Sequence, residues 1–265
     1  MNTPVNLFHA LIFGIVEGIT EFLPISSTGH LMLTARVLGL SQTEFLKTFE
    51  IVIQLGAILS VIVLYWRTLI VNIEALKRVI LAFIPTAVLG LIFYKIIKHL
   101  LMGSSQVVLW SMFVGGICLI VFELIHKEKD NALEDIGSIP YRTSLLIGLF
   151  QSIAMIPGVS RSAATIVGGL VLGLKRKTIV EFSFILAVPT MLAATVLDLM
   201  KNVNQFSIAQ INFLSIGFIL SFVFALLSVK FLLNFIKHHS FISFGIYRII
   251  LALLFWVFSS SMEHF

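Results

Sequence analysis

Residues 17–31 read EGITEFLPISSTGHL, and this stretch decides how the chain folds. It lies inside the hydrophobic region Leu7–Leu40, where Pro24 and the serine, threonine and glycine that follow it break the helical pattern. The arm after the break, residues 29–38, spans about 15 Å at 1.5 Å per residue, half of a hydrocarbon core about 30 Å thick. We therefore expect residues 7–40 to form a re-entrant helical hairpin, which enters and leaves the membrane on one side.

A second region, Thr143–Leu174, has the same organisation. Its break reads PGVSRS at residues 157–162, and we expect a second re-entrant hairpin over residues 143–174. Upstream of the breaks, FGIVEGI at residues 13–19 aligns with IGLFQSI at residues 147–153. This similarity indicates an internal repeat.

The composition is that of a membrane protein. Of 265 residues, 58% are hydrophobic and 12% are charged, and the mean hydropathy is +1.06. The single cysteine, Cys118, excludes a disulfide within the chain. Further apolar stretches are long enough to cross a bilayer as helices. The predicted spans are Phe45–Trp66, Arg78–Ile97, Val107–Ile125, Thr178–Met200, Ile211–Ile236 and Ser243–Phe258.

These segments predict the fold class: one all-α polytopic membrane domain over residues 1–265. The first repeat covers residues 1–126 and the second covers 143–261, and each contains one hairpin followed by three transmembrane helices. A hairpin leaves the chain on the same side of the membrane, whereas three spans carry it across. The second repeat is therefore expected to be inverted, an arrangement that places sites near the bilayer midplane, where broken helices meet.

The distribution of basic residues predicts the orientation. The net charge of +5 does not indicate nucleic acid, because most of the 18 lysines and arginines fall in loops on one side, near residues 67–78, 126–142, 174–177 and 230–248. This bias makes that side cytoplasmic. Both termini and the mouth of the first hairpin are then expected to be extracytoplasmic. We interpret the run from Lys175 to Lys177 as an anchor at an anionic leaflet.

Three charged residues are predicted to lie at bilayer depth: Glu17, Glu21 and Arg161. Each costs at least about 2.5–3.5 kcal/mol to insert, so each is a candidate functional residue. Glu17 and Glu21 are four residues apart and project from one face of a helix. Two carboxylates this close indicate either a bound Mg²⁺ or Ca²⁺, or a shared proton. Glu50 and Glu181, at equivalent positions of the repeat, are either supporting or interfacial residues.

The residues after each break are typical of an anion site. Arg161 begins the half-helix of the second hairpin, where free N–H groups, the positive helix end and a guanidinium all favour phosphate. Thr165 lies on the same helical face and offers a hydroxyl. The first half-helix begins with Ser26, Ser27 and Thr28. If the hairpins meet, two helix N-termini converge on one anion, and a diphosphate fits there.

Within these motifs we assign candidate roles. Ser27 is a candidate nucleophile, and His30 could act as a base, as an acid for the leaving phosphate, or as the residue that orients a serine. For Ser26, Ser27 and Ser160 helix capping is the alternative role. The candidate catalytic residues are Glu21, Ser27, His30 and Arg161. The candidate substrate-binding residues are Ser26, Thr28, Gly158, Ser160, Ser162 and Thr165, and the candidate metal ligands are Glu17 and Glu21.

The motifs at residues 17–31 and 157–165 resemble the two signature motifs of the bacterial undecaprenyl-diphosphate phosphatase family, also called bacitracin-resistance proteins. The resemblance extends over the whole chain. It implies hydrolysis of undecaprenyl diphosphate to undecaprenyl phosphate and phosphate, which recycles the lipid carrier for cell-wall synthesis in the bacterial inner membrane, with a divalent cation required. The family's site residues match Glu17, Glu21, Ser27, His30, Ser160, Arg161 and Thr165.

The expected partners are the polyprenyl diphosphate and membrane lipid, with a homodimer left open and nucleic acid excluded. The main alternative function is a polyprenyl-phosphate transporter or flippase, because inverted repeats with broken helices are also a transporter architecture. A non-catalytic scaffold is the second alternative. It has no use for three ionisable groups at depth.

Overall fold

The computed structural model describes residues 6–41, 43–96, 104–128, 132–202 and 211–262. Within these ranges the structure is helical, apart from an isolated bridge between Leu133 and Leu174. Five helices are long and apolar enough to cross a membrane. They are α3 (Glu44–Ile70), α4 (Ile73–Ile96), α5 (Ser105–Ile125), α8 (Arg176–Asn202) and α9 (Ile211–Phe235).

These five helices confirm five predicted spans with small shifts at their ends. The largest shift is in α4, which begins at Ile73 rather than at Arg78. The predicted end of that span, Ile97, lies outside the described residues. The sixth predicted span is observed as α10 (Ile242–Met262), whose apolar part Ile242–Val257 is shorter than the other spans.

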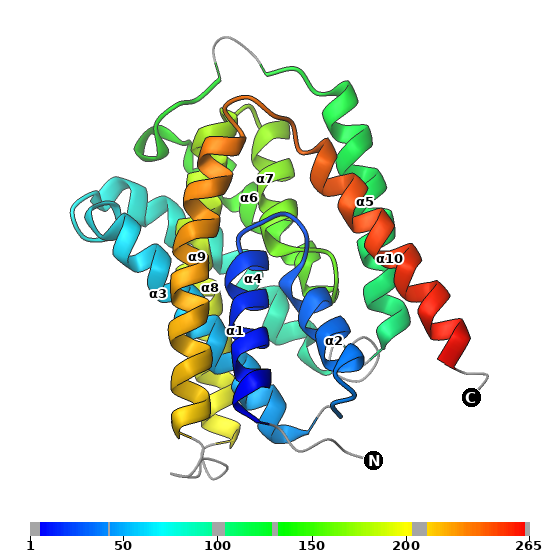
Figure 1. Cartoon of the computed structure of the whole chain (residues 1–265). Helices are drawn as coiled ribbons and strands as arrows, with labels where there is room; N and C mark the ends of the chain where they lie inside the picture. Colours follow the sequence, from blue (N-terminus) through cyan, green and yellow to red (C-terminus); the bar gives the residue numbers. More distant parts are fainter. Residues whose placement is uncertain (1–5, 42, 97–103, 129–131, 203–210, 263–265) are drawn as a thin grey trace.

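Both breaks predicted from the sequence are present. The first region forms α1 (Leu7–Thr20) and α2 (Ser27–Val37), and the second forms α6 (Tyr141–Ser152), the 3₁₀ helix η3 (Ile153–Met155) and α7 (Arg161–Val171). A further 3₁₀ helix, η2 (Ile136–Ser138), precedes α6. The turn between α1 and α2 lies in the interior of the molecule, between the α5–α10 pair and the group formed by α3, α8 and α9 (Figure 1). The repeat boundaries and the inversion remain predictions.

The first hairpin is held by a close helix contact between α1 and α9, which run side by side in Figure 1. A Cβ atom at Gly14 would lie 2.6 Å from the Gly217 carbonyl oxygen, and one at Gly18 would lie 2.6 Å from the Ser221 carbonyl oxygen. Small residues let two backbones approach in this way where lipid provides no hydrophobic drive between helices. The contact fixes the part of α1 that carries Glu17.

Two basic residues used to predict the orientation are not free loop charges. Arg248, counted with the loop at 230–248, is fully buried in α10. Arg176, expected at the lipid headgroups, forms an ion pair with Glu123, at 2.5 Å between Nη1 and Oε1. The Glu123 side chain is only 4% exposed and that of Arg176 is 19% exposed, so Arg176 is paired within the protein rather than free at its surface.

Candidate active site

The two turns share an unusual backbone conformation. Ser26 has φ 73° and Ser160 has φ 76°, and they are the non-glycine residues with positive φ in the described part of the chain. Each is the N-cap of the following half-helix: the Ser26 hydroxyl accepts from the Gly29 N–H, and the Ser160 hydroxyl accepts from the Ala163 N–H. Such a conformation costs about 1–3 kcal/mol per residue, so surrounding contacts must hold both turns.

The two turns are in contact with each other. The predicted convergence of the two helix N-termini depends on this contact. The Ser162 hydroxyl donates to the Phe22 carbonyl oxygen at 2.9 Å. Arg161 Nη2 lies 3.2 Å from Glu21 Oε1, forming an ion pair between the hairpins. The Arg161 side chain is 12% exposed and that of Glu21 is 7% exposed, so the pair is screened from bulk solvent. A phosphate at this point would face two helix N-termini and a guanidinium.

Glu21 connects the nucleophile candidate to this ion pair. The Ser27 hydroxyl donates a hydrogen bond to Glu21 Oε2, while Glu21 Oε1 faces Arg161. Arg161 Nη1 donates to the Ser183 carbonyl oxygen at 2.9 Å, and its buried Nε has no hydrogen-bond partner in the described part of the chain. A carboxylate that already accepts the hydroxyl proton of a serine is placed to act as its general base.

Glu17 is the least satisfied polar group near the site. Its exposure is 0%, no donor among the described residues bonds to either carboxylate oxygen, and the Glu21 carboxyl lies within hydrogen-bonding reach of it. Its electrostatic neighbours are Glu21, Glu50 and Arg161. An isolated buried carboxylate is costly, so this side chain suits a shared proton or a hard cation. The described residues contain no group of three or more His, Cys, Asp or Glu side chains arranged to hold a metal ion.

Glu50 and Glu181 differ despite their equivalent sequence positions. Glu50 lies beside Glu17, whereas Glu181 is 4.0 Å from Lys177 on its own helix. Of these two residues, only Glu50 therefore lies near the carboxylates of the site.

His30 does not contact the Ser27 hydroxyl. Its Nδ1 is 2.7 Å from the Ser26 carbonyl oxygen, and its Nε2 is 2.8 Å from the hydroxyl of Tyr247 in α10. The orienting role considered for His30 is filled by Glu21 in this structure. His30 remains a candidate acid or base at the other side of the turn.

The remaining predicted substrate-binding residues mostly form contacts inside the protein. Thr165 donates to the Arg161 carbonyl oxygen at 2.8 Å. Gly158 has φ 91°, and a Cβ atom there would lie 2.5 Å from the Val108 carbonyl oxygen. Thr28 is exposed. Of these polar groups, Thr28 has the side chain most open to a ligand, and the others shape the turns.

Arg248 was missed as a site residue. Its guanidinium donates to the carbonyl oxygens of Pro24 in the first turn at 3.4 Å, and of Val159 and Gly158 in the second turn at 3.0 Å each. It also donates to two carbonyl oxygens of α5, those of Ser111 and Met112. Arg248 therefore joins both turns to the α5–α10 pair. The signal in the sequence was a lone charge inside a predicted span, the property that singled out Arg161.

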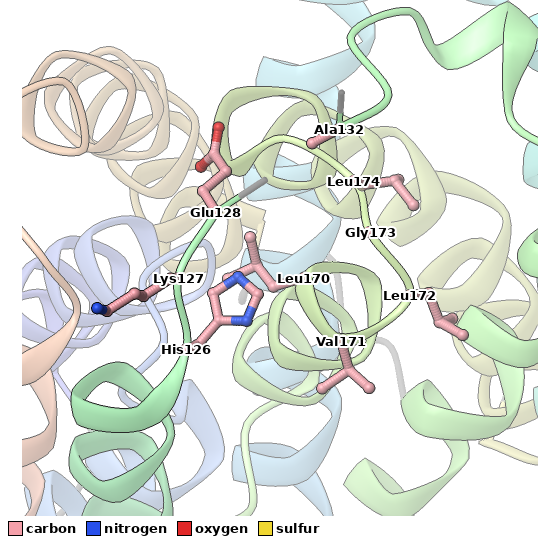
Figure 2. A pocket seen from close by; sticks show the side chains of 9 residues that line it. All are labelled: His126, Lys127, Glu128, Ala132, Leu170, Val171, Leu172, Gly173 and Leu174. Carbon is pink, nitrogen blue, oxygen red and sulfur yellow. The ribbon is translucent and has the colours of Figure 1, made fainter. Parts of the chain in front are cut away.

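A separate pocket of about 200 Å³ lies at the C-terminal end of α7, whereas Arg161 begins that helix. Figure 2 shows the side chains that line the pocket. It is lined by His126, Lys127, Glu128, Ala132 and residues 170–174. None of the predicted site residues lines it, so we do not assign it to the active site.

The fold defines a multi-pass helical membrane protein, and its two turns bring Ser27, Glu21 and Arg161 into contact as a candidate anion-binding site. The family model described as bacitracin resistance protein BacA matches residues 10–254, and the chain belongs to this family. The undecaprenyl-diphosphatase of Aquifex aeolicus is 54% identical over 95% of this chain and 98% of its own. That of Methanococcus aeolicus is 42% identical over 96% of this chain and 98% of its own.

Proposed function

We propose that this protein hydrolyses undecaprenyl diphosphate to undecaprenyl phosphate and inorganic phosphate in the bacterial cytoplasmic membrane. The observation that carries the proposal is the contact series from the Ser27 hydroxyl through the Glu21 carboxylate to Arg161. It joins a nucleophile, a base and a phosphate-binding group across the two turns. The family membership and the activity named for the relatives support the same reaction.

In the proposed mechanism the terminal phosphoryl group lies at the two helix N-termini. Ser27 Oγ attacks its phosphorus, its proton passes to Glu21, and the bond to the oxygen of the lipid phosphate breaks. Water then hydrolyses the phosphoserine and releases inorganic phosphate. Arg161 and the half-helix N–H groups stabilise the charge on the transferred group, which is the main contribution that proteins make to phosphoryl transfer.

Glu17 and Glu21 are the residues proposed to hold a divalent cation, Mg²⁺ or Ca²⁺. A bound cation would neutralise negative charge on the phosphate oxygens. The unpartnered, buried oxygens of Glu17 support this assignment. Adding either metal back to EDTA-treated protein tests it: Glu17→Gln should raise the metal concentration needed for half activity, and an unchanged requirement would contradict the assignment.

An apolar groove of about 300 Å³ gives the lipid tail a place beside the site. It is lined by Ile12, His30, Leu33, Thr34, Val37, Leu38, Leu251 and Phe255. His30 belongs both to the first turn and to the wall of this groove. With the tail in the groove, the lipid phosphate lies on the His30 side and the terminal phosphate on the Ser27 side.

We also propose that the mouth of the first hairpin is extracytoplasmic. Removing Arg248 from the loop charges leaves the cytoplasmic side enriched in lysine and arginine, which supports this orientation.

Phosphate release from a long-chain polyprenyl diphosphate, measured with purified protein in detergent, tests the function. Ser27→Ala should lower release by at least about 100-fold, because it removes the attacking oxygen. Ser60→Ala is the matched control, since the Ser60 hydroxyl bonds only to the Ala57 carbonyl oxygen within α3. Full release by Ser27→Ala would show that another group attacks phosphorus, whereas lipid movement in vesicles without phosphate release would favour the transporter.

A further inference from the structure

The hydroxyl of Tyr247 is the only protein group on the outward nitrogen of His30 among the described residues. The oxygen lies 2.8 Å from His30 Nε2, and the two ring planes are nearly parallel, at 6°. The two residues are far apart in the chain, so this contact ties α10 to the first half-helix. Tyr247 is part of neither turn and carries no role in the reaction as described above.

The other ring nitrogen fixes the direction of this hydrogen bond. His30 Nδ1 is 2.7 Å from the Ser26 carbonyl oxygen, and a carbonyl oxygen can only accept. Nδ1 therefore carries the hydrogen, and in the neutral ring Nε2 carries the lone pair. The Tyr247 hydroxyl must then be the donor. Two contacts from opposite sides hold the imidazole in one tautomer and one orientation.

The position of this contact relates it to the substrate. Tyr247, Leu251 and Phe255 follow one another at intervals of four residues, so they lie on one face of α10. Leu251 and Phe255 line the apolar groove together with His30. The tyrosine hydroxyl thus lies where the apolar groove meets the polar turn, on the side assigned to the lipid phosphate.

We propose that Tyr247 is a positioning residue for His30, holding the imidazole at the lipid-phosphate half of the diphosphate, the leaving group of the reaction. This inference rests on the proposed function. Tyr247 acts through His30, by fixing the orientation in which the ring lies beside the departing lipid phosphate. It contributes neither the nucleophile nor the charge that binds the terminal phosphate.

Tyr247→Phe tests the proposal, because it keeps the ring and removes only the hydroxyl. A neutral hydrogen bond of this kind corresponds to about a 3- to 10-fold effect. We expect kcat to fall by that factor while KM changes less than about twofold. Tyr141→Phe is the matched control, because the Tyr141 hydroxyl contacts Glu74 in another part of the molecule. A loss confined to KM, or wild-type kcat, would overturn the proposal.

A double-mutant cycle with His30→Asn separates positioning from a general structural effect. His30→Asn should lower kcat by about 100-fold or more. If Tyr247 acts through His30, adding Tyr247→Phe to that variant lowers kcat no further, whereas multiplied effects would overturn the proposal. Wild-type protein that releases no phosphate would instead contradict the proposed function, before any tyrosine variant is measured.

Discussion

The two hairpin turns have the same backbone conformation but carry different side chains. Each has a serine at positive φ that caps a short half-helix, and each directs a helix N-terminus toward the other. The first turn carries the acid and nucleophile candidates, with Glu21 accepting from Ser27. The second carries Arg161 and hydroxyls that bond within the protein. One turn thus carries the candidate reacting groups, and the other carries the positive charge and hydroxyls that bond within the protein.

The largest effect is expected from replacing the guanidinium of the second turn. Arg161→Lys keeps the positive charge but replaces the two separate nitrogens that bond Ser183 and Glu21 with a single ammonium nitrogen. We expect kcat/KM for phosphate release to fall by about 100-fold or more. Arg176→Lys, which alters an ion pair with Glu123 outside the site, is the control. Near-normal turnover by Arg161→Lys would contradict the proposal that the second turn binds phosphate through the Arg161 guanidinium.

A smaller effect, on stability, is expected from Arg248, the α10 residue that bonds to both turns. Arg248→Lys replaces a planar guanidinium bonded to Pro24, Gly158 and Val159 with a single ammonium group. Losing bonds from a buried charged donor should cost about 2–3 kcal/mol. Thermal unfolding in detergent measures this loss. An unchanged transition would mean that the turns hold their positions without Arg248.

The smallest effect is expected from the caps, where the turns should behave alike. Ser26→Ala and Ser160→Ala each remove one cap, so each should lower the free energy of unfolding by about 1 kcal/mol. Ser26→Gly and Ser160→Gly should cost less, because glycine adopts positive φ without strain. Thermal unfolding of these four variants would show whether the capping serine contributes the same stability in both turns. Unequal losses would point to different support around each turn.

Local patterns in the sequence predicted the breaks, the capped half-helices and the five long spans. The breaks depend on residues that are close together in the chain, Pro24, Pro157 and the serines after them. Their effect can therefore be predicted from a single segment. The pairing of Arg161 with Glu21 was a consequence of the predicted meeting of hairpins. Which atoms would meet was not predictable, because it depends on packing between helices that are distant in the chain.

The contacts made by α10 illustrate what local reasoning missed. Arg248 lies inside a predicted span, yet counting it as a loop charge hid its role. Tyr247 had no motif at all, and only its distance from His30 identifies it. Capping was the right alternative for Ser26 and Ser160 but not for Ser27, because the Ser27 side chain turns to Glu21.

The position of Arg248 also bears on the order in which the site is assembled during biosynthesis. Both hairpins precede α10 in the chain, so a ribosome-bound chain that has inserted both hairpins still lacks the guanidinium that joins their turns. The strained serines and the paired acids are then present without their common support. Catalytic geometry is therefore expected to form only after α10 has been translated and inserted.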